Sequence, residues 1–195
     1  MDAITQQLMQ QLTGSAMTKI GKKIGTDKNT ATEALSMAMP LIMSALANNA
    51  SKPEGAQALH QALNQDHDGS ILNNVPGYLR NPQAANGAGI LKHVLGTQQP
   101  TVAQGLAKGT GLSSEQIAQL LQIAAPLIMG ALGKQQQQQG FDPNGLSSYL
   151  GNQRQAVQQS NPNLMGVVNN LLDFNQDGSA IDDIIGVVGG LLKKR

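Results

Sequence analysis

The feature that most constrains the fold of this chain is a repeat within it. Residues 38–46 and residues 124–132, which lie 86 positions further on, have the same sequence except at two positions. At this offset the likeness continues backward without a gap to Ile20 and Leu106. A likeness of this length predicts that the chain contains two related copies of one structural unit, packed together with pseudo-symmetry.

A second likeness further along the chain shows that the two copies differ in length. Residues 64–71 resemble residues 173–180, but here the offset is 109 positions. The later copy therefore contains an insertion, which we assign in part to Gln135–Gln139, a low-complexity spacer without an apolar residue to bury. We place the boundary in residues 81–87. Residues 1–86 then form the first helical unit, and residues 87–195 form the second, which ends in an Asp/Gly loop and a helix.

Composition and periodicity both favour an all-α fold. The chain is 40% hydrophobic but contains only two Tyr, two Phe and no Trp, so its core must be aliphatic and filled with methionine, which suits packed helices better than sheets. In the second copy, apolar residues recur at the spacing of one helix face. They are Ile117, Leu120, Leu121, Ala124, Ile128, Ala131 and Leu132. Further helices are predicted at residues 3–12, 15–24, 54–63, 89–95, 100–108, 145–150, 162–172 and 180–193.

Capping residues mark the start of the long helix in each copy. Ser113 is followed three residues later by Gln116, which is the pattern of a capping box. In the first copy, either Asp27 or Thr30, together with Glu33, plays the same part. The sequence therefore predicts equivalent helix starts in the two copies.

Each long helix also contains a proline and has a predicted end. Pro40 and Pro126 occupy equivalent positions inside the helices, where proline removes a backbone hydrogen bond at a cost of roughly 3 kcal/mol. We expect a kink at the same place in both copies, either as a bend that wraps the helix around the core or as a hinge. Asn48-Asn49 and Gly133 are the predicted stops. The predicted fold is thus an all-α duplication with proline-kinked long helices.

Three segments of the chain together resemble one bacterial protein family. They are the run APLIMGALG at residues 125–133, the run ILKHVLG at residues 90–96, and the helix led by Asp-Gly-Ser near the C-terminus. In these segments the chain is similar to the family catalogued as domain of unknown function 937. The resemblance covers most of the chain and consists of packing and capping patterns. It implies a bacterial helical protein and no particular activity.

Charge and composition exclude several kinds of chemistry and partner. The 13 Lys and Arg nearly balance the 12 Asp and Glu, and a net charge of +1 provides no electrostatic footprint for a phosphate backbone. We therefore expect no nucleic-acid partner. The chain has no cysteine, which excludes disulfides, thiolate metal sites and a cysteine nucleophile.

The sequence predicts a cytoplasmic protein that does not span a membrane. The N-terminal segment carries four glutamines within residues 6–11, where a signal peptide needs an unbroken apolar stretch. The longest apolar segments, such as residues 37–47 and 184–192, are shorter than the about 20 residues that a bilayer requires.

One motif suggests a metal site. Asp173, Asn175 and Asp177 place oxygen-bearing side chains at alternate positions before Gly178, as calcium-binding loops do, and Asp183 follows closely. The bidentate glutamate expected at loop position twelve is replaced by Ile184. The alternative is an Asx-type turn that leads into a capped helix.

The corresponding loop of the first copy carries Asp66 and Asp68. It has fewer formal charges than the loop at residues 173–177. If calcium is the ligand, we therefore expect the later loop to bind it more tightly.

The C-terminal segment at residues 184–195 has an apolar body and the basic tip Lys193-Lys194-Arg195. A segment of this composition is able to lie on an anionic membrane surface. It is also able to pack into the core through Ile184, Val187 and Leu191, with its cations at the negative end of the helix dipole. If exposed, it would serve as a dimerisation surface.

No catalytic pattern is visible in the sequence. A Gly-x-Ser-x-Gly elbow, a P-loop and a dinucleotide fingerprint are all absent, and His60, His67 and His93 lack the spacing of a zinc-binding pair. We therefore interpret the chain as a non-enzymatic helical scaffold without a cofactor, which acts through a protein partner or through self-association. Calcium binding by the Asp/Gly loops and peripheral membrane attachment through the C-terminal helix are the two alternatives.

Overall fold

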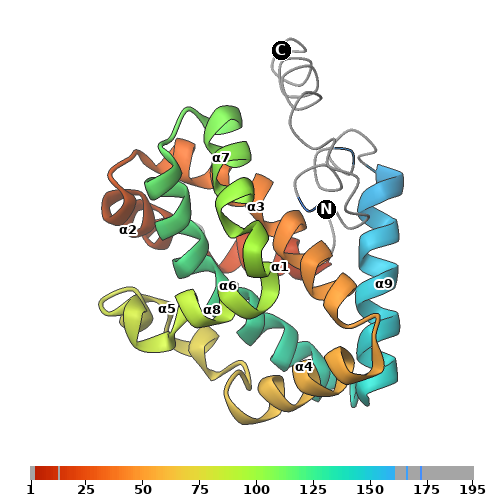
Figure 1. The fold of residues 1–195 in the computed structure, drawn as a ribbon. Coiled ribbons are helices and arrows are strands. Elements are labelled where there is room, and N and C mark those ends of the chain that lie inside the picture. Colours follow the sequence, from red (N-terminus) through yellow and green to blue (C-terminus); the bar gives the residue numbers. More distant parts are fainter. Residues whose placement is uncertain (1–2, 13, 161–165, 167–171, 173–195) are drawn as a thin grey trace.

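The computed structural model describes residues 3–12, 14–160, 166 and 172, and this part of the chain is helical without a β-strand, which confirms the all-α prediction (Figure 1). The α-helices are α1 (Ala3–Gln11), α2 (Ser15–Ile24), α3 (Lys28–Asn49), α4 (Pro53–Gln65), α5 (Val75–Tyr78), α6 (Gly87–Leu95), α7 (Gln99–Thr110), α8 (Ser114–Gln139) and α9 (Pro143–Ser160). Three short 3₁₀ segments connect them: η1 (Ser70–Asn74), η2 (Pro82–Ala85) and η3 (Gly96–Gln98).

Helix α8 lies at the centre of the described structure. It packs against α1, α2, α3, α4, α6 and α7 (Figure 1). Helix α3 is the second organising element, because it contacts α8 and also α2, α6, α7 and α9. Helix α9 runs along the outside and packs across both α3 and α4. The other helices therefore form a layer around the α3–α8 pair.

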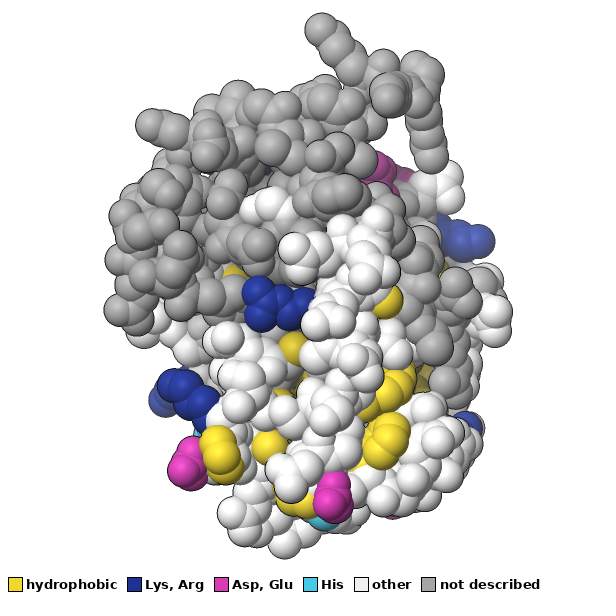
Figure 2. Space-filling model, turned by 90° about the vertical axis from the view of Figure 1, so that its right-hand side faces the viewer, with side chains coloured by type: hydrophobic (Ala, Val, Ile, Leu, Met, Phe, Trp, Pro, Cys, Tyr) yellow, Lys and Arg dark blue, Asp and Glu magenta, His cyan; other side chains and the backbone are white. Residues whose placement is uncertain are grey.

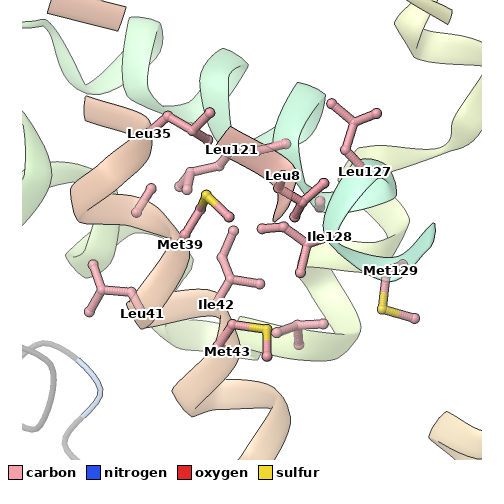
Figure 3. Close-up of a cluster of buried hydrophobic side chains, with 14 of the residues drawn as sticks. Leu8, Leu35, Met39, Leu41, Ile42, Met43, Leu121, Leu127, Ile128 and Met129 are labelled. Atoms are coloured by element: carbon pink, nitrogen blue, oxygen red, sulfur yellow. The ribbon is translucent and has the colours of Figure 1, made fainter. Parts of the chain in front are cut away.

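The contact between α3 and α8 forms the middle of the core. Figure 3 shows Leu8 of α1 among side chains that include Met39 and Ile42 from α3 and Leu121 and Ile128 from α8. Each of these five side chains is at most 1% exposed, and burying a side chain of this size contributes about 1.5–3 kcal/mol. The buried apolar residues on both sides of the predicted boundary belong to one cluster, so the two predicted units share one interior.

The predicted helix starts are confirmed at the level of single hydrogen bonds. One carboxylate oxygen of Asp27 accepts from the backbone N–H of Asn29 at 2.7 Å and of Thr30 at 3.1 Å. Asp27, and not Thr30, is therefore the N-cap of α3. At the start of α8, the Ser113 hydroxyl accepts from the Gln116 N–H, and the Gln116 side chain accepts from the Ser113 N–H. This reciprocal pair is the capping box that the sequence predicted.

The prediction for residues 133–139 is wrong in two respects. Helix α8 continues through Gly133 and through the glutamine tract, and it ends at Gly140, whose φ of 62° suits glycine. Gln136 is only 3% exposed, although we expected a spacer with nothing to bury. Its amide nitrogen donates to the Asn64 side-chain oxygen at 2.8 Å, whereas its amide oxygen is buried without a hydrogen-bond partner. The partner on α4 therefore offsets only part of the cost of burying this polar side chain.

The same corner of the molecule joins three helices. The His60 Nε2–H of α4 donates to the carbonyl of Phe141, just before α9, at 3.0 Å. Asn64 lies between His60 and Gln136, and its side-chain nitrogen is 3.4 Å from the His60 Nδ1. The His60–Asn64 contact lies within α4, whereas the bonds to Phe141 and from Gln136 leave this helix. These two bonds fix α4 relative to α8 and to the start of α9.

Two helices are longer than the apolar segments in the sequence indicated. By length and composition, α3 with 22 residues and α8 with 26 residues are each able to cross a bilayer. The prediction that no segment reaches this length is therefore wrong, because the helices extend beyond their apolar runs. Both are mostly buried in the described structure, as core helices of soluble proteins also are, so their length is weak evidence for a membrane span.

Close helix contacts depend on glycine at particular positions. A Cβ on Gly133 of α8 would collide with the carbonyl of His67, at the end of α4. A Cβ on Gly87 of α6 would likewise collide with the carbonyl of Gln122 in α8. In both cases the obstacle is backbone, which has no alternative rotamer. The surrounding helices therefore approach α8 to a distance that only glycine permits.

We predict that Gly133→Ala destabilises the protein although alanine is the better helix former. Forcing an atom against the His67 carbonyl costs about 1–3 kcal/mol in comparable overpacked sites. The matched control is Gly151→Ala in α9, where a Cβ meets nothing within 4 Å and the helix gains up to about 1 kcal/mol. Urea denaturation should show a lower midpoint for Gly133→Ala and an equal or higher one for Gly151→Ala. Equal midpoints would contradict the close contact.

A second prediction concerns the N-cap of α3. Hydrogen bonds from the Thr30 side chain and from the Thr30 and Asn29 backbone hold the pKa of Asp27 below its ordinary value, so the ionised cap contributes stability at neutral pH. This contribution begins to be lost when the pH falls to about 4, the ordinary pKa of an aspartate in the unfolded chain. It is lost completely once the pH has fallen through the lower pKa of Asp27 in the folded protein. Asp27→Asn keeps an acceptor but no charge. We expect it to be less stable than wild type at pH 7 and to match it in acid, as measured by thermal melts across this range.

Candidate functional site

The described residues form a groove between α4 and α6, with a volume of about 610 Å³. Both helices pack on α8 (Figure 1), and Met129 of α8 lines the groove between them. Apolar side chains from four helices line its interior: Leu46, Leu59, Ile90, Val94 and Met129. An apolar concave surface with a few polar groups around it is the usual form of a binding site.

The α4 wall of the groove combines three small residues with the larger Glu54 and Leu59. Gly55, Ala58 and Ala62 are three or four residues apart, so they share one face of the helix. On the opposite wall, Gly89 and Ile90 belong to the first turn of α6. The small residues on α4, together with Gly89 on α6, leave volume open between the two helices.

Charged residues stand at the two ends of the groove. Lys52 and Glu54 lie at the start of α4, and Asp66 follows its last residue. A neighbouring cavity of about 400 Å³ shares Asp66 and His67 with the groove and adds Asp68. Since a helix of 13 residues is about 20 Å long, the mixed-charge end and the acidic end are separated by about this distance.

Two histidines that are 26 positions apart in the sequence line the same groove. The Nδ1–H of His93 donates to the Gly89 carbonyl at 2.8 Å, so Nε2 is the acceptor nitrogen of this ring. The backbone around His93 is fixed as well, because the Asn49 side chain donates to the carbonyls of His93 at 3.2 Å and Val94 at 3.0 Å. The α3–α6 side of the groove is therefore held by hydrogen bonds.

His67 lies half-buried in the groove. Burial lowers the pKa of its imidazole, and the nearby Asp66 carboxylate opposes this effect only in part. Burial has this direction because removal from water disfavours the charged form. At neutral pH the acidic end of the groove therefore has no cationic imidazole to offset its carboxylates.

Of the six predicted metal ligands, only Asp66 and Asp68 lie within the described residues. One Asp68 carboxylate oxygen accepts from the Ser70 N–H at 2.9 Å, and hydrogen bonds from the Ser70 hydroxyl and backbone lower the pKa of Asp68. This is the Asx-type turn that we gave as the alternative for such loops. Asp66 lies beside it. Within the described part of the chain, no group of three His, Cys, Asp or Glu side chains is placed to hold a metal ion.

The later loop falls outside the described residues. Asp173, Asn175, Asp177 and Asp183 belong to it, and so does the C-terminal segment at residues 184–195. Calcium binding, membrane attachment and dimerisation through these residues therefore stay predictions.

The face formed by α9 differs from the groove. Figure 2 shows the described part of this face, on which scattered charged and hydrophobic side chains lie among backbone and uncharged polar groups. This agrees with the sequence of α9, which is rich in Gln, Asn and Ser. The face offers neither the apolar interior nor the charged ends that the groove has.

Fold and groove together define a class: an all-helical protein with one core and a preformed apolar groove on its surface. The chain belongs to the family described as bacterial protein of unknown function (DUF937), whose model matches residues 6–135. This confirms the resemblance inferred from the sequence, and α4, α6 and α8 up to Gln135 lie within the matched residues. Comparisons with curated proteins and with solved structures find no significant match.

The sequence did not reveal the groove. His67 and His93 have no informative spacing, and they line the same groove only because α4 and α6 pack on the same helix. A signal was present in the three small residues on one face of α4, Gly55, Ala58 and Ala62. Such a face buries little apolar area, but sequence alone does not say whether a neighbour fills the space beside it.

The burial of His67 leads to a test by NMR. We predict that its imidazole titrates below the ordinary histidine value in the folded protein and at the ordinary value in urea. Because the folded pKa is the lower one, the unfolded chain binds the proton more tightly, and the stability contributed by neutral His67 is lost as the pH falls from about 6.5. His67→Gln should flatten this part of the stability profile. An unshifted His67 titration would place the ring in water and not in the groove.

Proposed function

We propose that this protein is a non-enzymatic scaffold that works through contacts with other protein chains, and that the groove between α4 and α6 is its docking surface. The observation that carries this proposal is the groove itself, with an apolar interior, several small residues on its α4 wall and charges at its ends. Grooves of this kind take the apolar face of a helix, with side chains three or four residues apart as anchors.

The chemistry of the groove supports binding more than catalysis. None of the described residues that line it has a hydroxyl or thiol group, so its two histidines have no side-chain nucleophile beside them to activate. Its carboxylates stand at the ends and not over the apolar interior. We therefore propose that the groove requires neither a cofactor nor a reaction to fulfil its function.

The walls are preorganised, which favours binding. Asn49 ties α3 to the backbone of α6, and the bonds of His60 and Gln136 tie α4 to its neighbours. A rigid groove loses less conformational entropy when a partner binds than a mobile one does.

We also propose that the fold arose by duplication and that its prolines act alike in both copies. Equivalent positions have the same local conformation: Gly25 and Gly111 end helices with φ of 77° and 72°, and Asp27 and Ser113 are N-caps. Pro40 and Pro126 are both buried inside the long helices that follow. These correspondences favour two copies that share one core, with each proline bending its helix around that core.

For location and partners, we propose a cytoplasmic protein that binds protein and not nucleic acid. The net charge of +1 supports this, because it gives no attraction to a phosphate backbone. The burial of α3 and α8 supports a role in the core for both helices, in place of a membrane span.

Photo-cross-linking in the native bacterium tests the scaffold proposal. A photoreactive residue replaces Ala62 in the groove or, as a matched control, the exposed Ala156 on α9. We expect a defined protein peptide to be linked to position 62 and not to position 156. We also expect Ala58→Arg, which fills the groove, to abolish the product while the circular dichroism spectrum is unchanged. If position 62 yields no protein adduct in cells, or if both positions yield the same set, the groove is not a protein-docking surface.

A further inference from the structure

The groove has a direction, because its two ends differ in charge. At the start of α4, Lys52 and Glu54 are two residues apart and their charges oppose each other. At the other end stand the two carboxylates of Asp66 and the adjoining Asp68, and burial favours the neutral form of His67. Lys134, which packs against Gly69, is one cation beside these two carboxylates, so this end keeps an acidic excess. A complementary occupant therefore has an apolar body followed by a basic end.

The chain itself contains a segment with this order. Residues 184–192 are made of Ile, Val, Leu and Gly only, and they are followed by Lys193, Lys194 and Arg195. Ile184, Val187, Val188 and Leu191 recur at the spacing of one helix face. As a helix, the twelve residues from 184 to 195 would measure about 18 Å, which matches the about 20 Å of α4 along the groove.

We propose that the groove between α4 and α6 binds the segment Ile184–Arg195 of a second copy of this protein, with the apolar residues over Leu59 and Met129 and the basic end beside Asp66 and Asp68. This inference rests on the proposed docking function and names its occupant. The segment has its apolar residues and its basic residues in the same order as the apolar interior and the acidic end of the groove. Charge fixes the direction of binding, and apolar burial provides most of the affinity.

The described chain leads away from the groove, and we assign the groove to the segment of a second copy. Helix α9 begins beside α4, where the Phe141 carbonyl accepts from His60, and its 18 residues carry the chain about 27 Å away along α3 (Figure 1). The described chain thus leaves the groove. The contact joins two different surfaces of two copies, so it is heterologous, and it assembles rings or open chains of subunits in place of a twofold dimer.

Cysteine cross-linking tests the contact directly, because the natural chain contains no cysteine. One full-length preparation, labelled with ¹⁵N, carries Ala62→Cys, and a second, unlabelled preparation carries Leu191→Cys. After they are mixed and mildly oxidised, we expect a disulfide between the labelled groove peptide and the unlabelled C-terminal peptide. Ala156→Cys replaces Ala62→Cys as the control, and its yield should be at least tenfold lower.

A charge exchange adds an outcome that misfolding cannot imitate. Asp66→Lys with Asp68→Lys should weaken self-association at least tenfold in sedimentation experiments at low salt, and so should Lys193→Glu with Lys194→Glu. A mixture of these two variants should associate again, since each supplies the charge that the other lacks, and thermal melts confirm that both are folded. Absence of this rescue overturns the proposal.

Two further outcomes also decide the question. If a chain with both Ala62→Cys and Leu191→Cys closes only on itself and stays monomeric, the occupant belongs to the same molecule and our proposal is wrong. If position 62 cross-links in cells to a different protein and never to residues 184–195, the inference fails while the scaffold function stands. Absence of any protein adduct at position 62 overturns both.

Discussion

The contact between α3 and α8 is the constraint on which the rest of this structure depends. With few aromatic side chains in the sequence, the core cannot be filled by large rings, and many small aliphatic and methionine side chains must interdigitate instead. The two long helices supply more of these side chains than any other described helix, and each is buried over most of its middle section. Every other helix then gains stability by covering a part of this pair that would otherwise face water.

Glycine and alanine residues determine where the outer helices pack closely on α8 and where a groove remains between them. At Gly133 and Gly87 the absence of a side chain lets backbone of a neighbouring element come into contact with a helix. At Ala58 and Ala62 on α4 the side chains are also small, but here they line open space, which remains as the groove among the described residues. The same composition that permits close packing in one place thus creates a cavity in another.

Much of the fold was predictable because its signals are local. Asp27 and Ser113 cap helices where the sequence places them, since capping involves residues only two or three positions apart. The glutamine tract was misread for the opposite reason. Gln136 is buried because Asn64 accepts its hydrogen bond, and this partner lies 72 residues away. The short segment η1–α5–η2 was also missed, because a single helical turn carries no periodicity.

The candidate site was the least predictable part, because it belongs to no single segment. Its walls come from α4 and α6, its interior also from Leu46 of α3 and Met129 of α8, and each helix on its own resembles an ordinary amphipathic element. The groove forms because α4 and α6 both pack on α8. The hydrogen bonds of His60 and Gln136 then hold α4 in its position beside α8. The direction of the groove, however, follows from the chain itself. Asp66 and Asp68 come after the last residue of α4, where the helix dipole adds negative potential to the two carboxylates. The first turn of α6 lines the same end through Asn86 and Ile90, and its positive dipole end offsets part of this potential. The two carboxylates therefore provide the main attraction for a cationic partner end.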